Sequence, residues 1–102
     1  MSDLGAFSMW DLFRSEVDAQ MRVFTDGLLA LERGEPAHAH LASTMRAAHS
    51  IKGAGRIVQL DEAVSLAHAM EDCLVAAQEG VLSLQPASID VLLSAGDLLS
   101  QL

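Results

Sequence analysis

A chain of 102 residues, 51% of them hydrophobic, is long enough for one folded domain with a single core and too short for two. Fourteen acidic residues against six basic ones give a net charge of −8, which argues against a nucleic-acid partner, since a phosphate backbone is bound through clustered Lys and Arg. No apolar run approaches the length needed to cross a bilayer, so we expect no membrane insertion.

The first two predicted helices span about residues 8–33 and 36–58. Ser8, followed three residues later by Asp11, is typical of a helix N-cap, and Pro36 suits the first turn of the second helix. Apolar residues in both segments recur at steps of three and four, which predicts one buried face on each helix. These faces hold Trp10, Phe13, Val17, Met21, Phe24, Leu28 and Leu31 in the first helix, and Leu41, Thr44, Ala48, Ile51, Gly55 and Val58 in the second.

Two further helices are predicted over about residues 61–79 and 86–101. Asp61 is the expected N-cap of the third helix, and Pro86 opens the fourth. Gly80 lies just past the end of the third helix, where glycine is common. The predicted buried faces hold Val64, Ala67, Met70, Leu74 and Ala77 in the third helix, and Ile89, Leu92, Leu93, Ala95, Leu98 and Leu99 in the fourth.

Four amphipathic helices joined by short connections predict an all-α fold, a single domain over residues 1–102 built as an antiparallel four-helix bundle. The last helix reaches Leu102 without a cap, so we expect the chain to continue there, with room for a further C-terminal helix. No basic residue precedes Arg14, which argues against a secretion signal, and the single cysteine, Cys73, cannot form an internal disulfide. We therefore expect a cytoplasmic protein with Cys73 as a core thiol.

The second helix lies in a stretch of this acidic chain that contains no acidic residue, yet it holds three of the six basic residues, Arg46, Lys52 and Arg56. His49 lies in the middle of that stretch. At about 100° per residue, His49 lies well away from the apolar face, so its ring should be exposed or on the rim. Gly53, one turn along, costs the helix about 1 kcal/mol relative to alanine, and we interpret it as clearing access to the imidazole.

A carboxylate is expected beside the His49 ring. The second and third helices are joined by a tight turn near residues 59–60, so they must be antiparallel, and position 49 is level with about position 70. His68 and Glu71 bracket that level on one face of the third helix. A carboxylate that accepts a hydrogen bond from one ring nitrogen makes the other nitrogen a better nucleophile, and nearby cations would offset the charge of an arriving phosphoryl group.

Simpler readings of these residues stay open. A lone histidine on a helix rim usually has no function, and the neighbouring Arg and Lys are also typical of an ordinary solvated face. A helical adaptor that only binds a partner, with His49 incidental, is therefore an alternative. His38 and His40 are two residues apart and point to different sides of a helix, so no metal site is expected there.

Residues 47–53, Ala-Ala-His-Ser-Ile-Lys-Gly, resemble the H-[ST]-x-K-G signature of histidine phosphotransfer (HPt) domains. They are especially similar to the first domain of CheA-type chemosensory histidine kinases. That domain carries a second motif, a His followed three residues later by Glu, nineteen residues after the first histidine, and His68 and Glu71 stand at that spacing. The amino-acid sequence around both motifs also resembles one subgroup, the Wsp-type hybrid kinases that drive a diguanylate cyclase response regulator.

The resemblance implies a role for each site residue. His49 would be the phosphoacceptor and Glu71 its hydrogen-bonded orienter. Lys52 and His68 would complete the polar network, and Gly53 would give access to the ring. The domain would not be an enzyme on its own, because it has no nucleotide-binding motif and no cofactor.

The resemblance also implies the partners. A separate kinase domain of the parent chain would bind Mg-ATP and supply the γ-phosphoryl group. An aspartate of response-regulator receiver domains, that of a diguanylate cyclase among them, would accept it. We expect Arg46 and Arg56 to contact these partners. A free-standing phosphorelay shuttle that uses the same site is the nearest alternative. One position departs from the family: Gln59 stands where glycine is frequent, which puts the geometry of the turn in question.

Overall fold

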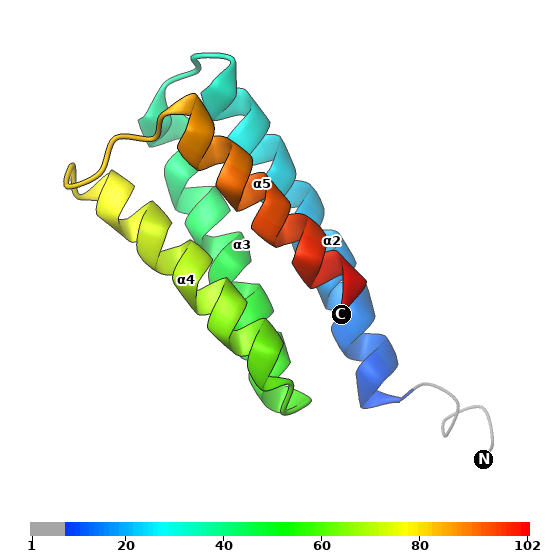
Figure 1. The fold of residues 1–102 in the computed structure, drawn as a ribbon. Coiled ribbons are helices and arrows are strands. Elements are labelled where there is room, and N and C mark those ends of the chain that lie inside the picture. Colours follow the sequence, from blue (N-terminus) through cyan, green and yellow to red (C-terminus); the bar gives the residue numbers. More distant parts are fainter. Residues whose placement is uncertain (1–7) are drawn as a thin grey trace.

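The computed structural model describes residues 8–102, and within them it consists of four helices and no strand. These are α2 (Met9–Glu32), α3 (Ala37–Ile57), α4 (Asp61–Gln78) and α5 (Pro86–Gln101). Each helix runs opposite to the one before it, which gives an antiparallel four-helix bundle (Figure 1). The predicted fold class is confirmed, and each helix lies within one residue or so of its predicted bounds. No helix among the described residues combines the length and apolarity of a membrane span.

The helices begin largely as predicted. Ser8 and Asp11 form a reciprocal capping box, in which the Ser8 hydroxyl accepts from the Asp11 N–H at 3.2 Å and the Asp11 carboxylate accepts from the Ser8 N–H at 3.0 Å. Pro86 lies in the first turn of α5. The predicted N-cap of α4 was wrong, because Leu60 takes that position without a side-chain bond and Asp61 is the first helical residue. The Asp61 carboxylate there still complements the positive end of the helix dipole.

Three of the four helices end in the same way, with a Schellman motif centred on a residue of positive φ. Gly34 (φ 86°) ends α2 and Gly80 (φ 78°) ends α4, but Gln59 (φ 59°) takes this position after α3. In that turn the Leu60 N–H donates to the Gly55 carbonyl and the Gln59 N–H donates to the Arg56 carbonyl. Gln59 thus adopts the conformation that the family's frequent glycine favours, so the α3–α4 turn forms in spite of the departure.

The core is formed by one apolar stripe from each helix, and most of the predicted positions are buried. Trp10 and Leu98 were predicted wrongly, with 43% and 56% of their surfaces exposed. Trp10 lies in the first turn of α2 and packs its ring against Phe13, with centroids 5.3 Å apart. The buried residues that form this core are Phe13, Val17, Met21, Phe24, Leu28, Leu41, Ala47, Ala48, Ile51, Ala63, Ala67, Met70, Leu74, Ile89, Leu92 and Leu99.

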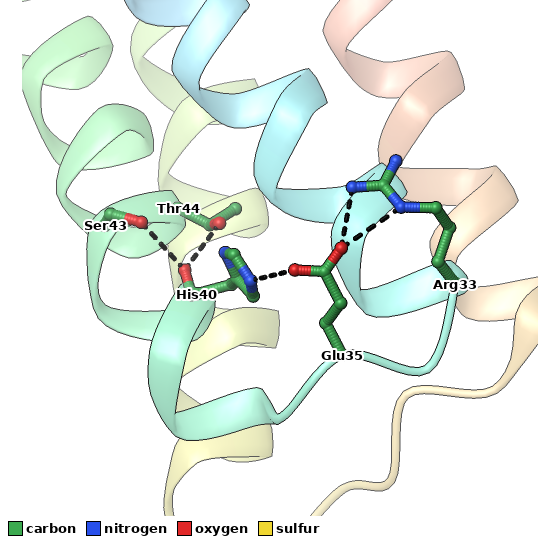
Figure 2. Close-up of polar contacts among 5 residues, drawn as sticks. All are labelled: Arg33, Glu35, His40, Ser43 and Thr44. Atoms are coloured by element: carbon green, nitrogen blue, oxygen red, sulfur yellow. Dashed lines mark hydrogen bonds and ion pairs between the residues drawn. The ribbon is translucent and has the colours of Figure 1, made fainter.

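Polar contacts fix α3 relative to α2 at their connection. Figure 2 shows the Glu35 carboxylate between the Arg33 guanidinium, at 2.9 Å, and the His40 ring, at 2.7 Å. Hydrogen bonds from Arg33 and then from His40 lower the pKa of the Glu35 carboxyl. One turn further along α3, the buried Thr44 hydroxyl donates to the His40 carbonyl at 2.8 Å, and Gly27 of α2 lies directly against Thr44.

Close packing also fixes α4 against α3. A Cβ atom at Gly55 would lie 3.1 Å from Cγ2 of Val64 on α4, so the absence of a side chain at Gly55 permits this close approach. Because the turn at Gln59 follows directly, the axial level of α4 is set at its start. Residues equally far from the turn along α3 and α4 therefore lie side by side, and this alignment positions the site.

Candidate functional site

His49 projects from the outer surface of α3, with 65% of its side chain exposed. Its Nδ1 atom lies 2.8 Å from Oε2 of Glu71 on α4. The contact joins two residues that are 22 positions apart in sequence, and it depends on the alignment of α3 and α4 described above. We predicted this pairing from the short turn between the two helices, and the structure brings the two side chains together as expected.

Glu71 is the central residue of the site. Only 17% of its side chain is exposed, and its Oε1 atom accepts a hydrogen bond from Lys52 Nζ at 2.5 Å. Burial alone would raise the pKa of the Glu71 carboxyl, but hydrogen bonds from Lys52 and His49 outweigh it and lower that pKa. The carboxylate is therefore ionised at neutral pH and has no proton to donate. In the neutral imidazole, His49 therefore donates from Nδ1, and its Nε2 carries the free lone pair.

Lys52 was predicted as part of this network, but its burial was not. Only 9% of its side chain is exposed, although the helical wheel places residue 52 beside His49 on the rim. The aliphatic stem of a lysine can pack along apolar surface while its ammonium group meets a polar partner. Here the stem lies at the α3–α4 interface and the ammonium group reaches Glu71.

His68 lies outside the network that the resemblance implied. Its Nε2 atom is 3.1 Å from Oδ2 of Asp72, one turn along α4, and both side chains are more than half exposed. Among residues 8–102, no hydrogen bond joins His68 to His49, Glu71 or Lys52. The physical reason is the position of His68 one turn before Glu71, on the outward side of α4.

Gly53 leaves open space beside the site, since a Cβ atom added there would meet nothing within 4 Å. It lies at one end of an apolar groove of about 630 Å³ between α2 and α3. This groove was not predicted from the sequence. The signal for it was the pair of apolar residues outside the predicted buried faces, Leu12 and Ile57, which are 46% and 66% exposed. The groove is lined by Met9, Leu12, Phe13, Ser15, Glu16, Ser50, Gly53, Ala54, Ile57 and Val58.

A second, smaller hollow of about 270 Å³ lies beside His49. It is lined by Met45, Arg46, His49, Ser50 and Glu71. Arg46 thus shares a hollow with His49. Arg56 is also exposed, but it lines neither the groove nor this hollow.

Other residues that could support chemistry are placed elsewhere. Burial raises the pKa of the Cys73 thiol, which disfavours the thiolate needed for nucleophilic attack. The His40 ring is held by Glu35, far along α3 from His49. Within the part of the chain that the structure describes, no three His, Cys, Asp or Glu residues are grouped to hold a metal ion.

The model of one protein family, described as the Hpt domain, matches residues 8–102. The chain is 32% identical over 92 residues to the chemotaxis protein CheA of Rhizobium meliloti (strain 1021), covering 90% of this chain and 12% of that protein. It is 27% identical over 97 residues to the chemotaxis protein CheA of Treponema pallidum (strain Nichols), covering 95% of this chain and 12% of that protein.

A solved structure shares the fold. It is the phosphorylated P1 domain of CheA3 in complex with CheY6 from R. sphaeroides, with a TM-score of 0.85 and 30% identity. The match covers 91% of this chain and 73% of that one.

Proposed function

The chain belongs to the Hpt domain family, and from that membership we propose that His49 accepts a phosphoryl group and passes it to an aspartate of a receiver domain. One observation carries the assignment of the residue. The His49 ring is exposed, and its Nδ1 is held by the ionised Glu71, so the nucleophilic Nε2 faces solvent. A residue that reacts with two different partner proteins in turn must be accessible from solvent, and the exposed Nε2 of His49 meets this condition.

The proposed chemistry needs no proton transfer on His49. The Nε2 lone pair attacks the γ-phosphorus of ATP held by a separate kinase domain, so that the N–P bond forms as the bond from phosphorus to the bridging oxygen of ADP breaks. The proton on Nδ1 stays, and the phosphorylated ring is therefore cationic. Glu71 stabilises that cation. In the second step an aspartate oxygen of the receiver attacks phosphorus, the N–P bond breaks, and neutral imidazole leaves.

The Lys52–Glu71 ion pair supports this role because it orients Glu71 independently of His49. Lys52 holds one carboxylate oxygen at 2.5 Å, so the other oxygen faces the position of the His49 ring whether or not the ring is phosphorylated. Partners that fix the orientation of an active residue commonly contribute 10–100-fold to activity, by analogy with groups that orient metal ligands. We propose Lys52 and Glu71 as positioning residues and His49 as the group that reacts.

We further propose that the receiver docks over the α2–α3 groove. The groove begins at Ser50 and Gly53, next to His49, and its rim exposes the apolar side chains of Leu12 and Ile57. Exposed apolar patches rimmed by polar residues are typical of protein-binding sites. The P1 domain of similar fold is in complex with CheY6 in its solved structure, and a receiver on this groove would be close enough to His49 for transfer.

The chain spans 12% of the length of each CheA relative, so the activity of a whole parent protein is a proposal as well. We propose that the kinase domain which binds Mg-ATP lies in the same parent chain and that the protein is cytoplasmic. The amino-acid sequence around the two motifs supports a finer assignment to Wsp-type hybrid kinases, with the receiver of a diguanylate cyclase among the acceptors.

The test is transfer in trans. The domain, incubated with Mg-ATP and a CheA-type kinase domain, should gain one phosphate that is labile in acid and stable in base, as a phosphoramidate is. The His49→Gln variant should gain none, with its helicity and Tm unchanged, because an exposed residue contributes little packing. An acid-stable label would assign the phosphate to a hydroxyl such as that of Ser50, and no label at all would favour the adaptor alternative.

A further inference from the structure

Phosphorylation of His49 would bring negative charges close together. A phosphoryl group carries between one and two negative charges at neutral pH, and it would be attached to a ring whose other nitrogen already faces the ionised Glu71. The cationic ring and the solvent offset part of this repulsion, because the site is exposed. A further cation within reach of the phosphoryl oxygens would stabilise the phosphorylated state beyond that.

Three of the nearby basic groups are not placed for this role. Lys52 donates to Glu71 on the buried side of the site, and His68 faces Asp72 on α4. Arg56 lies seven residues after His49, about 10 Å further along the helix axis. Side chains on a helix also tilt toward its N-terminus, so the His49 ring leans away from Arg56.

Arg46 meets each requirement that Arg56 fails. It lies three residues before His49, about 4.5 Å along the axis and on the adjoining side of α3. Because helical side chains tilt toward the N-terminus, the His49 ring lies over the turn that contains Arg46. Both side chains line the 270 Å³ hollow, and among residues 8–102 no carboxylate lies within ion-pair distance of the Arg46 guanidinium.

We propose that Arg46 binds the phosphoryl group carried by His49 and so stabilises the phosphorylated state of this domain. The inference rests on the proposed function and adds to it a phosphate-binding residue within the chain itself. A guanidinium group can donate two parallel hydrogen bonds to two phosphoryl oxygens, a geometry that lysine does not offer. The exposed, unpaired Arg46 would thus be engaged only when His49 is phosphorylated.

This role differs from the partner contact that the sequence suggested for Arg46. A residue that only contacts a kinase or receiver domain would change the rate of transfer and leave the isolated phosphorylated domain unaltered. A residue that binds the phosphoryl group changes the properties of that group with no partner present. An experiment on the isolated domain therefore distinguishes a role of Arg46 in partner contact from a role in binding the phosphoryl group.

The experiment uses chemical phosphorylation by potassium phosphoramidate, in which the His49 Nε2–P bond forms as the P–N bond of the reagent breaks and ammonia leaves. The phosphohistidine signal is followed by ³¹P NMR between pH 5 and 9, and the His49→Gln variant identifies signals from other histidines. Arg46→Gln is compared with Arg46→Lys and with Arg22→Gln. The last variant removes the same charge from an exposed position on α2, where Arg22 lines a hollow with Ser100 of α5.

A bound cation favours the dianionic phosphoryl group, so Arg46→Gln should raise the midpoint of the ³¹P titration. We expect a shift of about half a pH unit, smaller than a neighbouring charge gives in a buried site, because this site is exposed. Arg46→Lys should fall in between, and Arg22→Gln should match the wild type. Equal midpoints for Arg46→Gln and Arg22→Gln would overturn the inference while leaving the proposed function intact. No His49 signal in the wild type would overturn both.

Discussion

Lys52 and His49 hold the two oxygens of one carboxylate, that of Glu71, from the same side of the α3–α4 interface. The ammonium group lies 2.5 Å from Oε1 and Nδ1 of the ring lies 2.8 Å from Oε2. The Lys52 side chain is almost fully buried, and the His49 side chain is mostly exposed. The carboxylate thus connects the packing of the bundle to the reactivity of a surface residue, and the two functions should separate by mutation.

Replacing Lys52 with Met should destabilise the domain. The change leaves Glu71 largely buried without its cation, and breaking a buried pair in this way costs about 3 kcal/mol, although the exposed edge of Glu71 moderates the effect. Adding Glu71→Leu should recover most of that loss, because an apolar pair can pack at the same interface. Urea unfolding of both variants measures the two free energies. If the double variant is no more stable than Lys52→Met, the ion pair is not the source of the loss.

Glu71→Gln should slow phosphorylation of His49 while the fold is retained. The amide keeps the shape of the carboxylate but lacks the charge that stabilises the cationic, phosphorylated ring, and losses of this kind cost about 10–100-fold. Asp72→Asn is the matched control, since it removes a neighbouring exposed carboxylate that contacts His68 instead. Initial labelling rates with a kinase domain in trans compare the three proteins. Equal slowing by both substitutions would point to a general charge effect.

Much of this site could be predicted from the sequence, because it depends on helical periodicity and on one short turn. The turn near Gln59 sets the alignment of α3 and α4 together with the close packing at Gly55, and a short turn is enough to predict that position 71 lies near the level of His49. The burial of Lys52 could not be predicted, since a helical wheel gives the direction of Cβ and not the path of a long side chain. His68 was misplaced for a related reason: the motif gives its spacing from Glu71, but only the packing shows that it faces outward toward Asp72.

The stability of the domain should depend on pH through Glu71. Its pKa in the folded protein lies below the ordinary value of 4.5, so its contribution is fully present above about pH 5 to 6 and is lost as pH falls through the lowered pKa. The difference in unfolding free energy between the wild type and Glu71→Gln should therefore be constant from pH 8 to 6 and shrink toward pH 3.5. Urea unfolding at these pH values measures it. A difference that grows on acidification would mean that the carboxyl is stabilised in its protonated form.

Gln59→Gly should stabilise the α3–α4 turn. Gln59 has φ 59°, where a Cβ atom costs about 1 kcal/mol, and glycine adopts this conformation without that cost. The greater freedom of glycine in the unfolded chain offsets part of the gain, so we expect about 0.5 kcal/mol. Gln59→Ala keeps the Cβ atom and should give no gain. Urea midpoints of the three proteins decide the matter, and equal gains from both substitutions would assign the effect to loss of the Gln side chain.

The α2–α3 groove provides the last prediction, which separates recognition of a receiver from the chemistry of His49. Leu12 and Ile57 expose 46% and 66% of their surfaces on the two sides of the groove, and neither belongs to the buried core. A charge at either position would disrupt an apolar contact with a partner without altering the packing of the bundle. We therefore expect Leu12→Glu and Ile57→Glu to retain the wild-type Tm and the wild-type rate of phosphorylation by phosphoramidate.

Transfer to the receiver should respond differently. Truncation or charging of a central apolar contact in a small transient interface costs about 1–2 kcal/mol, which corresponds to a loss of roughly 5–30-fold in the second-order rate constant. Val91→Glu is the control, because Val91 lies on α5 outside the groove and is about as exposed, at 68%, as Ile57. The measurement is the loss of label from the phosphorylated domain at increasing receiver concentrations. Equal rates for the groove variants and for Val91→Glu would show that the receiver reaches His49 from another side, with Glu71 and α4 as the next surface to vary.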